Sequence, residues 1–119
     1  MESYRDLIAW QKAVELVVSI YRITKAFPKT EMYGLANQMQ RAAVSVPSNI
    51  AEGHGLKQTQ AYSRHLAIAS GSLAELETQI EISKRLGYLP KEETNILEQA
   101  NEVGRILSGL RRSLRRPPS

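Results

Sequence analysis

The sequence predicts an all-α fold, an up-down-up-down four-helix bundle, from three observations. Apolar residues recur at helical spacing in four long segments, strong helix breakers separate these segments, and the connections are only a few residues long. Short connections require consecutive helices to run antiparallel. The expected helices span about 7–27, 31–53, 59–86 and 90–115, in a single domain of residues 1–119 with a short tail at 117–119.

The first expected helix carries two apolar stripes. One comprises Leu7, Trp10, Val14, Val17 and Tyr21. The other lies beside it and comprises Ala13, Leu16, Ile20, Ile23 and Phe27. Together the stripes cover about half of the helix circumference, beyond the roughly 100° of an ordinary surface helix. A helix this apolar is expected to contact more than one neighbour.

The second expected helix has one apolar face, and Thr30 is its expected N-cap. The face comprises Leu35, Met39, Ala42, Val46 and Ile50. Pro47 lies inside this pattern, where it removes one backbone donor and clashes with the carbonyl of Ala43. We therefore expect a kink at Pro47 and not a break in the helix.

The third and fourth expected helices also show regular apolar faces. The third face comprises Tyr62, Leu66, Ala69, Leu73, Leu76 and Ile80. Thr59 is the expected cap at its start, and Gly87 suits the left-handed position that ends it. The fourth helix is expected to begin at Pro90, with Glu92 and Glu93 in its first turn. Its face comprises Ile96, Ala100, Val103, Ile106, Leu107, Leu110 and Leu114.

Composition excludes several classes of protein. The chain has 42% apolar and 24% charged residues, which is ordinary for a globular domain, and it has no Cys. A disulfide framework, a cysteine nucleophile and a thiolate metal site are therefore excluded. The polar start shows no signal peptide, and no uncharged stretch is long enough to span a bilayer. We expect a cytoplasmic protein with no membrane partner.

The sequence also lacks familiar catalytic patterns. No acidic residue has a His three positions later, as the di-iron sites of helical bundles require. Asp6 is the only Asp, so a Ser-His-Asp triad would need a residue at the very start of the chain. His54 and His65 are expected to be surface or packing residues. We expect no enzyme, no metal site and no cofactor.

Charge is concentrated at the end of the fourth helix. Residues 103–119 carry five Arg and neither Asp nor Glu, and helical spacing places these Arg side chains opposite the apolar face. The candidate nucleic-acid-binding residues are Arg105, Arg111, Arg112, Arg115 and Arg116. Because no aromatic residue accompanies them, binding to RNA or DNA would involve mainly the phosphate backbone.

Two other functions remain open at this stage. The arginines could serve only solubility, in a bundle that acts as a scaffold for a protein partner. A bundle bound to a membrane surface is disfavoured, because the fourth helix has no Trp or Phe to anchor it.

Several segments resemble one known family. Residues 41–53, Arg-Ala-Ala-Val-Ser-Val-Pro-Ser-Asn-Ile-Ala-Glu-Gly, resemble the signature of four-helix-bundle proteins encoded in intervening sequences of 23S ribosomal RNA genes. Further segments match in order: Asp6-Leu7-x-x-Trp10-Gln11-Lys12-Ala13, Phe27-Pro28, Glu31-x-Tyr33-Gly34-Leu35, Ala69-x-Gly71-Ser72-Leu73-x-Glu75-Leu76-Glu77 and Leu86-Gly87-Tyr88-Leu89.

The resemblance implies a left-handed bundle that assembles into a ring-like homopentamer. It further implies a cytoplasmic bacterial protein with no established catalytic activity. A more distantly similar protein is the accessory protein of diversity-generating retroelements, a basic pentamer that binds nucleic acid and a partner reverse transcriptase. The arginine-rich end is outside the segments that carry the resemblance, so nothing about it follows from the family.

One polar stripe within the signature has two interpretations. Arg41, Ser45, Asn49 and Glu52 recur every three or four residues and therefore share one side of the second helix. They could form a binding site. We favour a hydrogen-bonded network that satisfies the carbonyl freed by Pro47 and sets helix register, because buried polar groups must be paired.

Overall fold

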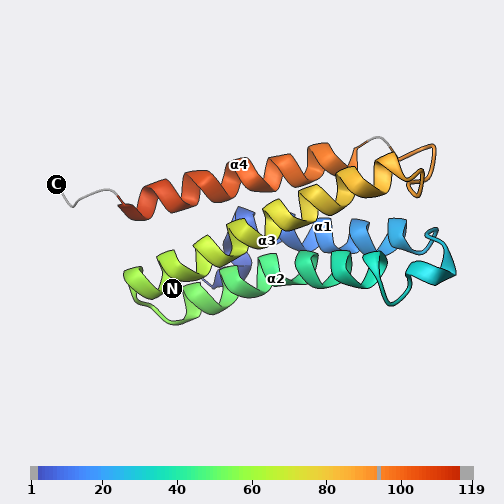
Figure 1. The fold of residues 1–119 in the computed structure, drawn as a ribbon. Helices are drawn as coiled ribbons and strands as arrows, with labels where there is room; N and C mark the ends of the chain where they lie inside the picture. The colour runs from blue at the N-terminus through green and yellow to red at the C-terminus, as the bar shows by residue number, and fades with distance from the viewer. Residues whose placement is uncertain (1–2, 94, 116–119) are drawn as a thin grey trace.

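The structure is a computed structural model that describes residues 3–93 and 95–115. It contains four long helices. They are α1 (Ile8–Thr24), α2 (Leu35–Gly55), α3 (Thr59–Arg85) and α4 (Ile96–Arg115). Short 3-10 turns, η1 (Tyr4–Asp6) and η2 (Lys29–Glu31), precede α1 and α2. The helices lie lengthwise beside one another, with extents of 52 × 22 × 21 Å (Figure 1).

Each helix packs against two others. α1 contacts α2, α2 contacts α3, α3 contacts α4, and α4 returns to contact α1. Consecutive helices run in opposite directions (Figure 1). The predicted all-α architecture of four helices in up-down order is therefore confirmed. One end of the bundle brings together the start of α3 and the ends of α2 and α4, while the shorter α1 begins further inside the bundle (Figure 1).

The core consists of one apolar face from each helix. Its largest fully buried side chains include Leu16, Ile20, Met39, Ile50, Leu66, Leu76, Val103 and Leu107. Burying one side chain of this size contributes about 1.5–3 kcal/mol to stability. These residues lie on the apolar faces that the periodicity predicts.

The two apolar stripes of α1 have different environments. Leu16 and Ile20 of the second stripe are completely buried. The first stripe is only partly covered: Trp10 and Val17 are half-buried and Tyr21 is 44% exposed. The expectation that α1 meets more than one neighbour is met by α2 and α4. The first stripe nevertheless leaves apolar surface in solvent.

The second helix begins later than residue 31, and Thr30 is not its cap. Its N-cap is Gly34, and the side chain of Glu31 accepts a hydrogen bond from the backbone N–H of Leu35 at 3.1 Å. Glu31 also accepts a bond from the hydroxyl of Tyr88 at 3.1 Å. The carboxylate thus serves one of the unpaired donors that every helix start presents, and it ties this turn to the α3–α4 connection.

The helix α2 is unbroken at Pro47, as expected. The kink there stays a prediction, and so does the left-handed sense of the bundle. At the end of α3, Gly87 adopts the left-handed backbone conformation, with φ of 76°. The N–H of Tyr88 bonds the carbonyl of Ser83, and the N–H of Gly87 bonds that of Lys84. This pair of bonds is a Schellman motif, so the predicted stop at Gly87 is confirmed.

Two other predicted helix boundaries and one predicted cap are wrong. α1 ends at Thr24 and not at residue 27, because the residue before Pro28 disfavours helical backbone. Thr59 is the first residue of α3, and the N-cap Gln58 makes no side-chain capping bond. α4 begins at Ile96, so Pro90 lies in the connection. In this connection Leu89 packs against the core, and the N–H of Glu93 bonds the carbonyl of Pro90 in a turn.

α2 and α3 approach each other closely near Gly53. A Cβ atom built on this buried glycine would lie 2.7 Å from the Cβ of His65 and 3.0 Å from a ring carbon of Tyr62. Real Cβ atoms do not approach neighbours this closely, so a larger residue here would push the helices apart. The glycine of the 41–53 segment is therefore required by packing.

Replacing Gly53 with Ala should destabilise the protein by about 1–3 kcal/mol, because overpacking outweighs the gain in helix propensity. The matched control is Gly71→Ala, an exposed position within α3 where the added Cβ would meet no described atom within 4 Å. That change should stabilise by about 0.5–1 kcal/mol. Urea denaturation measures both, and stabilisation by both substitutions would contradict the steric argument.

Candidate functional site

The polar stripe of α2 forms a hydrogen-bonded network with α3. The carboxamide nitrogen of Asn49 donates to the carbonyl of Ser45 at 2.9 Å and to its hydroxyl at 3.1 Å. The hydroxyl of Ser45 bonds that of Ser72 at 2.8 Å. The carboxamide oxygen of Asn49 lies 2.9 Å from Nδ1 of His65. Because an amide oxygen can only accept, Nδ1 of His65 must carry the proton of this bond.

Only half of the predicted stripe belongs to this network. Arg41 and Glu52 are exposed and make no side-chain hydrogen bond or ion pair within the described chain. The expectation that the stripe satisfies the carbonyl freed by Pro47 is wrong. Asn49 donates to the carbonyl of Ser45, and no described side chain donates to the carbonyl of Ala43. The network joins two helices and does not repair the helix at its proline.

The sequence could not identify His65 and Ser72 as the partners of this network. Both lie on α3, separated from Asn49 and Ser45 by 16 and 27 residues respectively. Helical spacing shows that polar side chains share a face of one helix. The choice of partner depends on the distance and register between two helices.

The five candidate arginines differ in their surroundings. Arg112 and Arg115 are exposed and have no ion pair among the described residues. Arg105 lies 3.3 Å from the carboxylate of Glu98, and both side chains are largely exposed. Such a surface pair contributes little to stability. Arg116 lies outside the described residues.

Arg111 is not free in solvent, and this corrects the expectation that every arginine points away from the bundle. Its guanidinium donates to the hydroxyl of Ser70 on α3 at 3.1 Å, and the residue is half-buried. The position lies at the border between the polar and apolar sides of α4. It therefore contributes to the contact between α3 and α4 as well as to the local charge.

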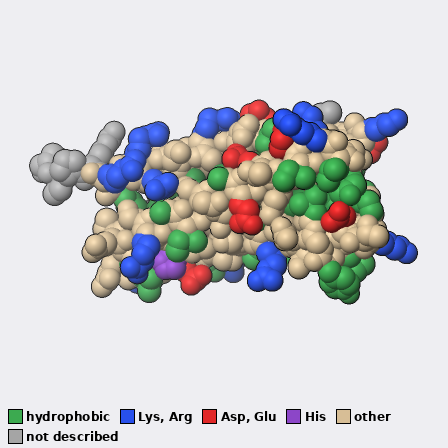
Figure 2. All heavy atoms as spheres, viewed as in Figure 1, with side chains coloured by type: hydrophobic (Ala, Val, Ile, Leu, Met, Phe, Trp, Pro, Cys, Tyr) green, Lys and Arg blue, Asp and Glu red, His purple; other side chains and the backbone are tan. Residues whose placement is uncertain are grey.

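The fold adds cations from outside α4 to this region. Lys57 lies in the α2–α3 turn and Arg64 lies near the start of α3, at the end of the bundle where α4 finishes (Figure 1). Figure 2 shows Lys and Arg side chains at both ends of the molecule, with fewer acidic side chains among them at this end. We call Lys57 and Arg64, together with Arg111, Arg112 and Arg115, the basic end.

Lys57 has an unusual backbone conformation. Its φ is +57°, in the left-handed region that disfavours side chains with a Cβ and favours glycine. Its N–H bonds the carbonyl of His54 at 3.3 Å, which closes the end of α2. An exposed cation therefore occupies the tip of the turn at some conformational cost.

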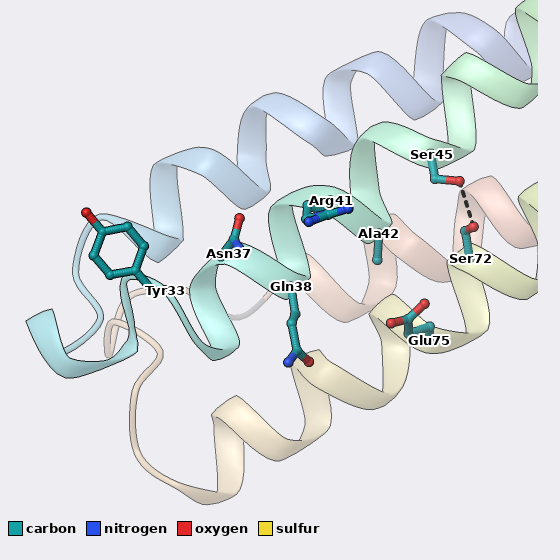
Figure 3. Close-up of a pocket in the computed structure, with 8 residues that line it drawn as sticks. All are labelled: Tyr33, Asn37, Gln38, Arg41, Ala42, Ser45, Ser72 and Glu75. Carbon is teal, nitrogen blue, oxygen red and sulfur yellow. Dashed lines mark hydrogen bonds between the residues drawn. The ribbon is translucent and has the colours of Figure 1, made fainter.

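Two open grooves lie between neighbouring helices of the bundle. One lies between α3 and α4, has a volume of about 650 Å³, and is lined by residues including Glu77, Arg105, Ser108 and Arg112. Burial raises the pKa of the Glu77 carboxyl. The other groove lies between α2 and α3, has a volume of about 440 Å³, and is lined by Tyr33 and the polar side chains drawn in Figure 3.

Two further properties concern the described residues 3–93 and 95–115. No three His, Asp or Glu side chains within them gather as the ligands of a metal ion would. None of the helices they form is long and apolar enough to cross a membrane.

The four helices pack antiparallel around a shared apolar core, and polar side chains line the grooves and one end of the molecule. This arrangement defines a four-helix-bundle protein. The 23S rRNA-intervening sequence protein family matches residues 5–109, and the chain therefore belongs to this family. Among curated proteins none matches the chain.

A solved structure shares the fold. It is the crystal structure of a protein of unknown function from the S23 ribosomal protein family of Bacteroides thetaiotaomicron. The two superpose with a TM-score of 0.78 at 21% identity, over 88% of this chain and 96% of the other. The likeness concerns the fold alone.

Replacing Asn49 with Ala should destabilise the protein by about 1–3 kcal/mol, because Nδ1 of His65 would lose its partner in a half-buried site and Ser45 would keep only its bond to Ser72. Ser48→Ala, at an exposed position on the same helix, is the matched control and should change stability by less than about 0.5 kcal/mol. Equal denaturation midpoints for the two variants would show that the network does not hold α2 against α3.

Proposed function

We propose that this protein is a non-catalytic, self-associating bundle that binds the phosphate backbone of RNA or DNA. The observation that carries the proposal is the basic end, where the fold collects cations from two separate parts of the chain. In residues 52–64 and 111–115, five Lys or Arg residues accompany one acid, Glu52. Such a surface attracts polyanions and binds them in a salt-dependent manner.

The accessible arginines suit backbone contacts better than the reading of bases. Arg112 and Arg115 lie on exposed turns of α4, and Arg112 also lines the groove between α3 and α4. Ser108 lines the same groove and offers a hydroxyl donor. Guanidinium and hydroxyl groups are common partners of phosphate oxygens. A backbone following α4 would meet both.

Self-association is supported by the first stripe of α1 and the neighbouring Val18. Val18 is 60% exposed and Tyr21 44% exposed, and Trp10, Val14 and Val17 are only half-buried. An apolar strip along most of one helix is costly in water and is typical of an interface. We propose that a second copy of the chain covers it. The pentamer itself is an expectation from the family resemblance.

Repetition of the basic end would strengthen a weak patch. Each copy in an assembly brings another set of cations, and several sets can contact one polyanion at the same time. Binding through linked sites exceeds the affinity of one site without any new contact. The two parts of the proposal therefore support each other.

Replacing Arg112 and Arg115 with Ala should weaken binding to RNA and DNA at low salt. Removing one phosphate contact should reduce the slope of log affinity against log salt concentration by roughly 0.7–0.9. Lys84→Ala with Lys91→Ala removes the same charge from exposed positions at the opposite end and should leave the slope unchanged. Filter binding across a salt series measures both. An unchanged slope in the arginine variant would contradict the assignment.

Replacing Val18 and Tyr21 with Asp should convert the assembly to monomers of 13.3 kDa. Both side chains are exposed in one copy, so charges there should leave the bundle folded. Leu56→Gln, which removes an exposed apolar side chain from the α2–α3 turn, is the control and should keep the wild-type mass. Light scattering distinguishes the outcomes, and a monomeric wild type would refute self-association.

The second candidate function is a scaffold for a protein partner. It is favoured if the wild type binds neither RNA nor DNA at low salt. The groove between α2 and α3 gives this candidate a specific location, because its chemistry differs from that of the basic end.

A further inference from the structure

The groove between α2 and α3 is polar, open and separate from the groove that the arginines of α4 line. Tyr33 marks one end, and the hydrogen-bonded hydroxyls of Ser45 and Ser72 mark the other (Figure 3). Between these two ends, the side chain of Gln38 extends from α2 toward α3, and Glu75 lies on α3 at the opposite side of the groove (Figure 3). The groove is therefore formed by side chains from two helices and not by a single surface residue.

Both ends of the groove are held in place by bonds outside it. Tyr33 is 88% exposed and belongs to the turn that Glu31 secures, through bonds from Leu35 and from Tyr88 on the other side of the bundle end. At the other end, Ser45 is bonded to Asn49 of the inter-helix network. The backbone at both ends of the groove is therefore fixed before a ligand binds, which lowers the entropy cost of binding there.

The lining residues match the chemistry of a peptide. The carboxamides of Asn37 and Gln38 each offer a donor and an acceptor, as a peptide unit does. Arg41 and Glu75 place one cation and one anion in the same groove. The exposed ring of Tyr33 provides a flat apolar surface with a polar tip, which suits contact with a side chain.

Charge balance argues against a polyanion in this groove. Arg41 is its single cation and Glu75 its single anion, so the lining carries no net charge. A nucleic-acid backbone would meet the Glu75 carboxylate along the path that leads to Arg41. A ligand with both signs of charge meets no such penalty, because its anion can face Arg41 while its cation faces Glu75.

We propose that the α2–α3 groove binds an extended polypeptide segment of a partner protein, with an acidic side chain of the peptide at Arg41 and a basic one at Glu75. The peptide backbone runs past the carboxamides of Asn37 and Gln38, and an apolar side chain packs on Tyr33. This inference names the partner chemistry for the second candidate function, the scaffold, and does not depend on nucleic-acid binding, since it concerns other residues and another class of ligand. The protein can therefore hold a protein partner while nucleic acid lies on the basic end.

The test uses short synthetic peptides that consist mainly of Gly, Ser and Ala. Each peptide carries one Glu and one Lys, at varied spacing and in both orders along the chain, and binding to the full protein is followed by fluorescence anisotropy. The wild type should prefer one order of charges by about fivefold, the effect of one partly exposed ion pair. The exchanged variant, Arg41→Glu with Glu75→Arg, should prefer the opposite order by a similar factor.

A matched control exchanges charges outside the groove. Glu81 and Arg85 form an ion pair at 2.9 Å on α3, and Glu81→Arg with Arg85→Glu should keep the wild-type order preference. Both exchanges involve largely exposed side chains, so circular dichroism should show an intact bundle. Tyr33→Ala should weaken binding of every selected peptide, and Tyr33→Phe should restore most of it.

Three outcomes would overturn the proposal. They are the absence of an order preference in the wild type, the same preference in the exchanged variant, and loss of single-stranded RNA binding in Tyr33→Ala with no peptide bound. The last result would assign the groove to nucleic acid. Failure here is distinct from failure of nucleic-acid binding at the basic end, because Arg112→Ala with Arg115→Ala should leave peptide binding unchanged.

Discussion

The close packing of α2 against α3 is the constraint on which the candidate surfaces depend. Gly53 allows the two backbones to approach, and any larger residue would meet His65 and Tyr62. Asn49 then joins the two helices through Ser45 and His65. Apolar packing alone tolerates small sliding of one helix past another, but directional bonds of this kind accept only one register. The register in turn sets which residues face each other across the neighbouring groove.

Apolar, basic and neutral polar surfaces lie at different places on the molecule. Apolar surface that the single copy does not bury lies along α1, cations gather at one end, and a neutral polar groove lies between α2 and α3. Up-down order explains the basic end, because alternate helix starts and ends meet there (Figure 1). Cations from two distant parts of the sequence thus lie at one end, although only the α4 cluster is visible as a run in the chain. The three surfaces that we propose for a second copy, a polyanion and a peptide therefore differ in chemistry and in position.

Much of the fold could be predicted from the sequence, and the errors share one cause. The apolar faces, the four helices and the stop at Gly87 follow from spacing and from the conformational freedom of glycine, which are local properties. Thr30 and Thr59 were predicted as helix caps, and Pro90 as a helix start, from local preference as well. In the structure, Glu31 bonds both the start of α2 and Tyr88, and Leu89 packs against the core in the connection before α4. Near Thr30 and Pro90 the chain therefore makes contacts with distant residues that local preference does not include.

The sequence by itself determined the class of fold, the buried face of each helix and the family resemblance, because helical periodicity and short connections leave few alternatives. It also separated the arginines of α4 from the apolar face of that helix. Only the tertiary structure decided the partners of the polar stripe and the contact of Arg111 with Ser70. It also decided that Lys57 and Arg64 lie at the same end of the bundle as the arginines of α4. The physical reason is that spacing along one helix specifies direction around its axis. Distance and register between helices arise only when four apolar faces pack together.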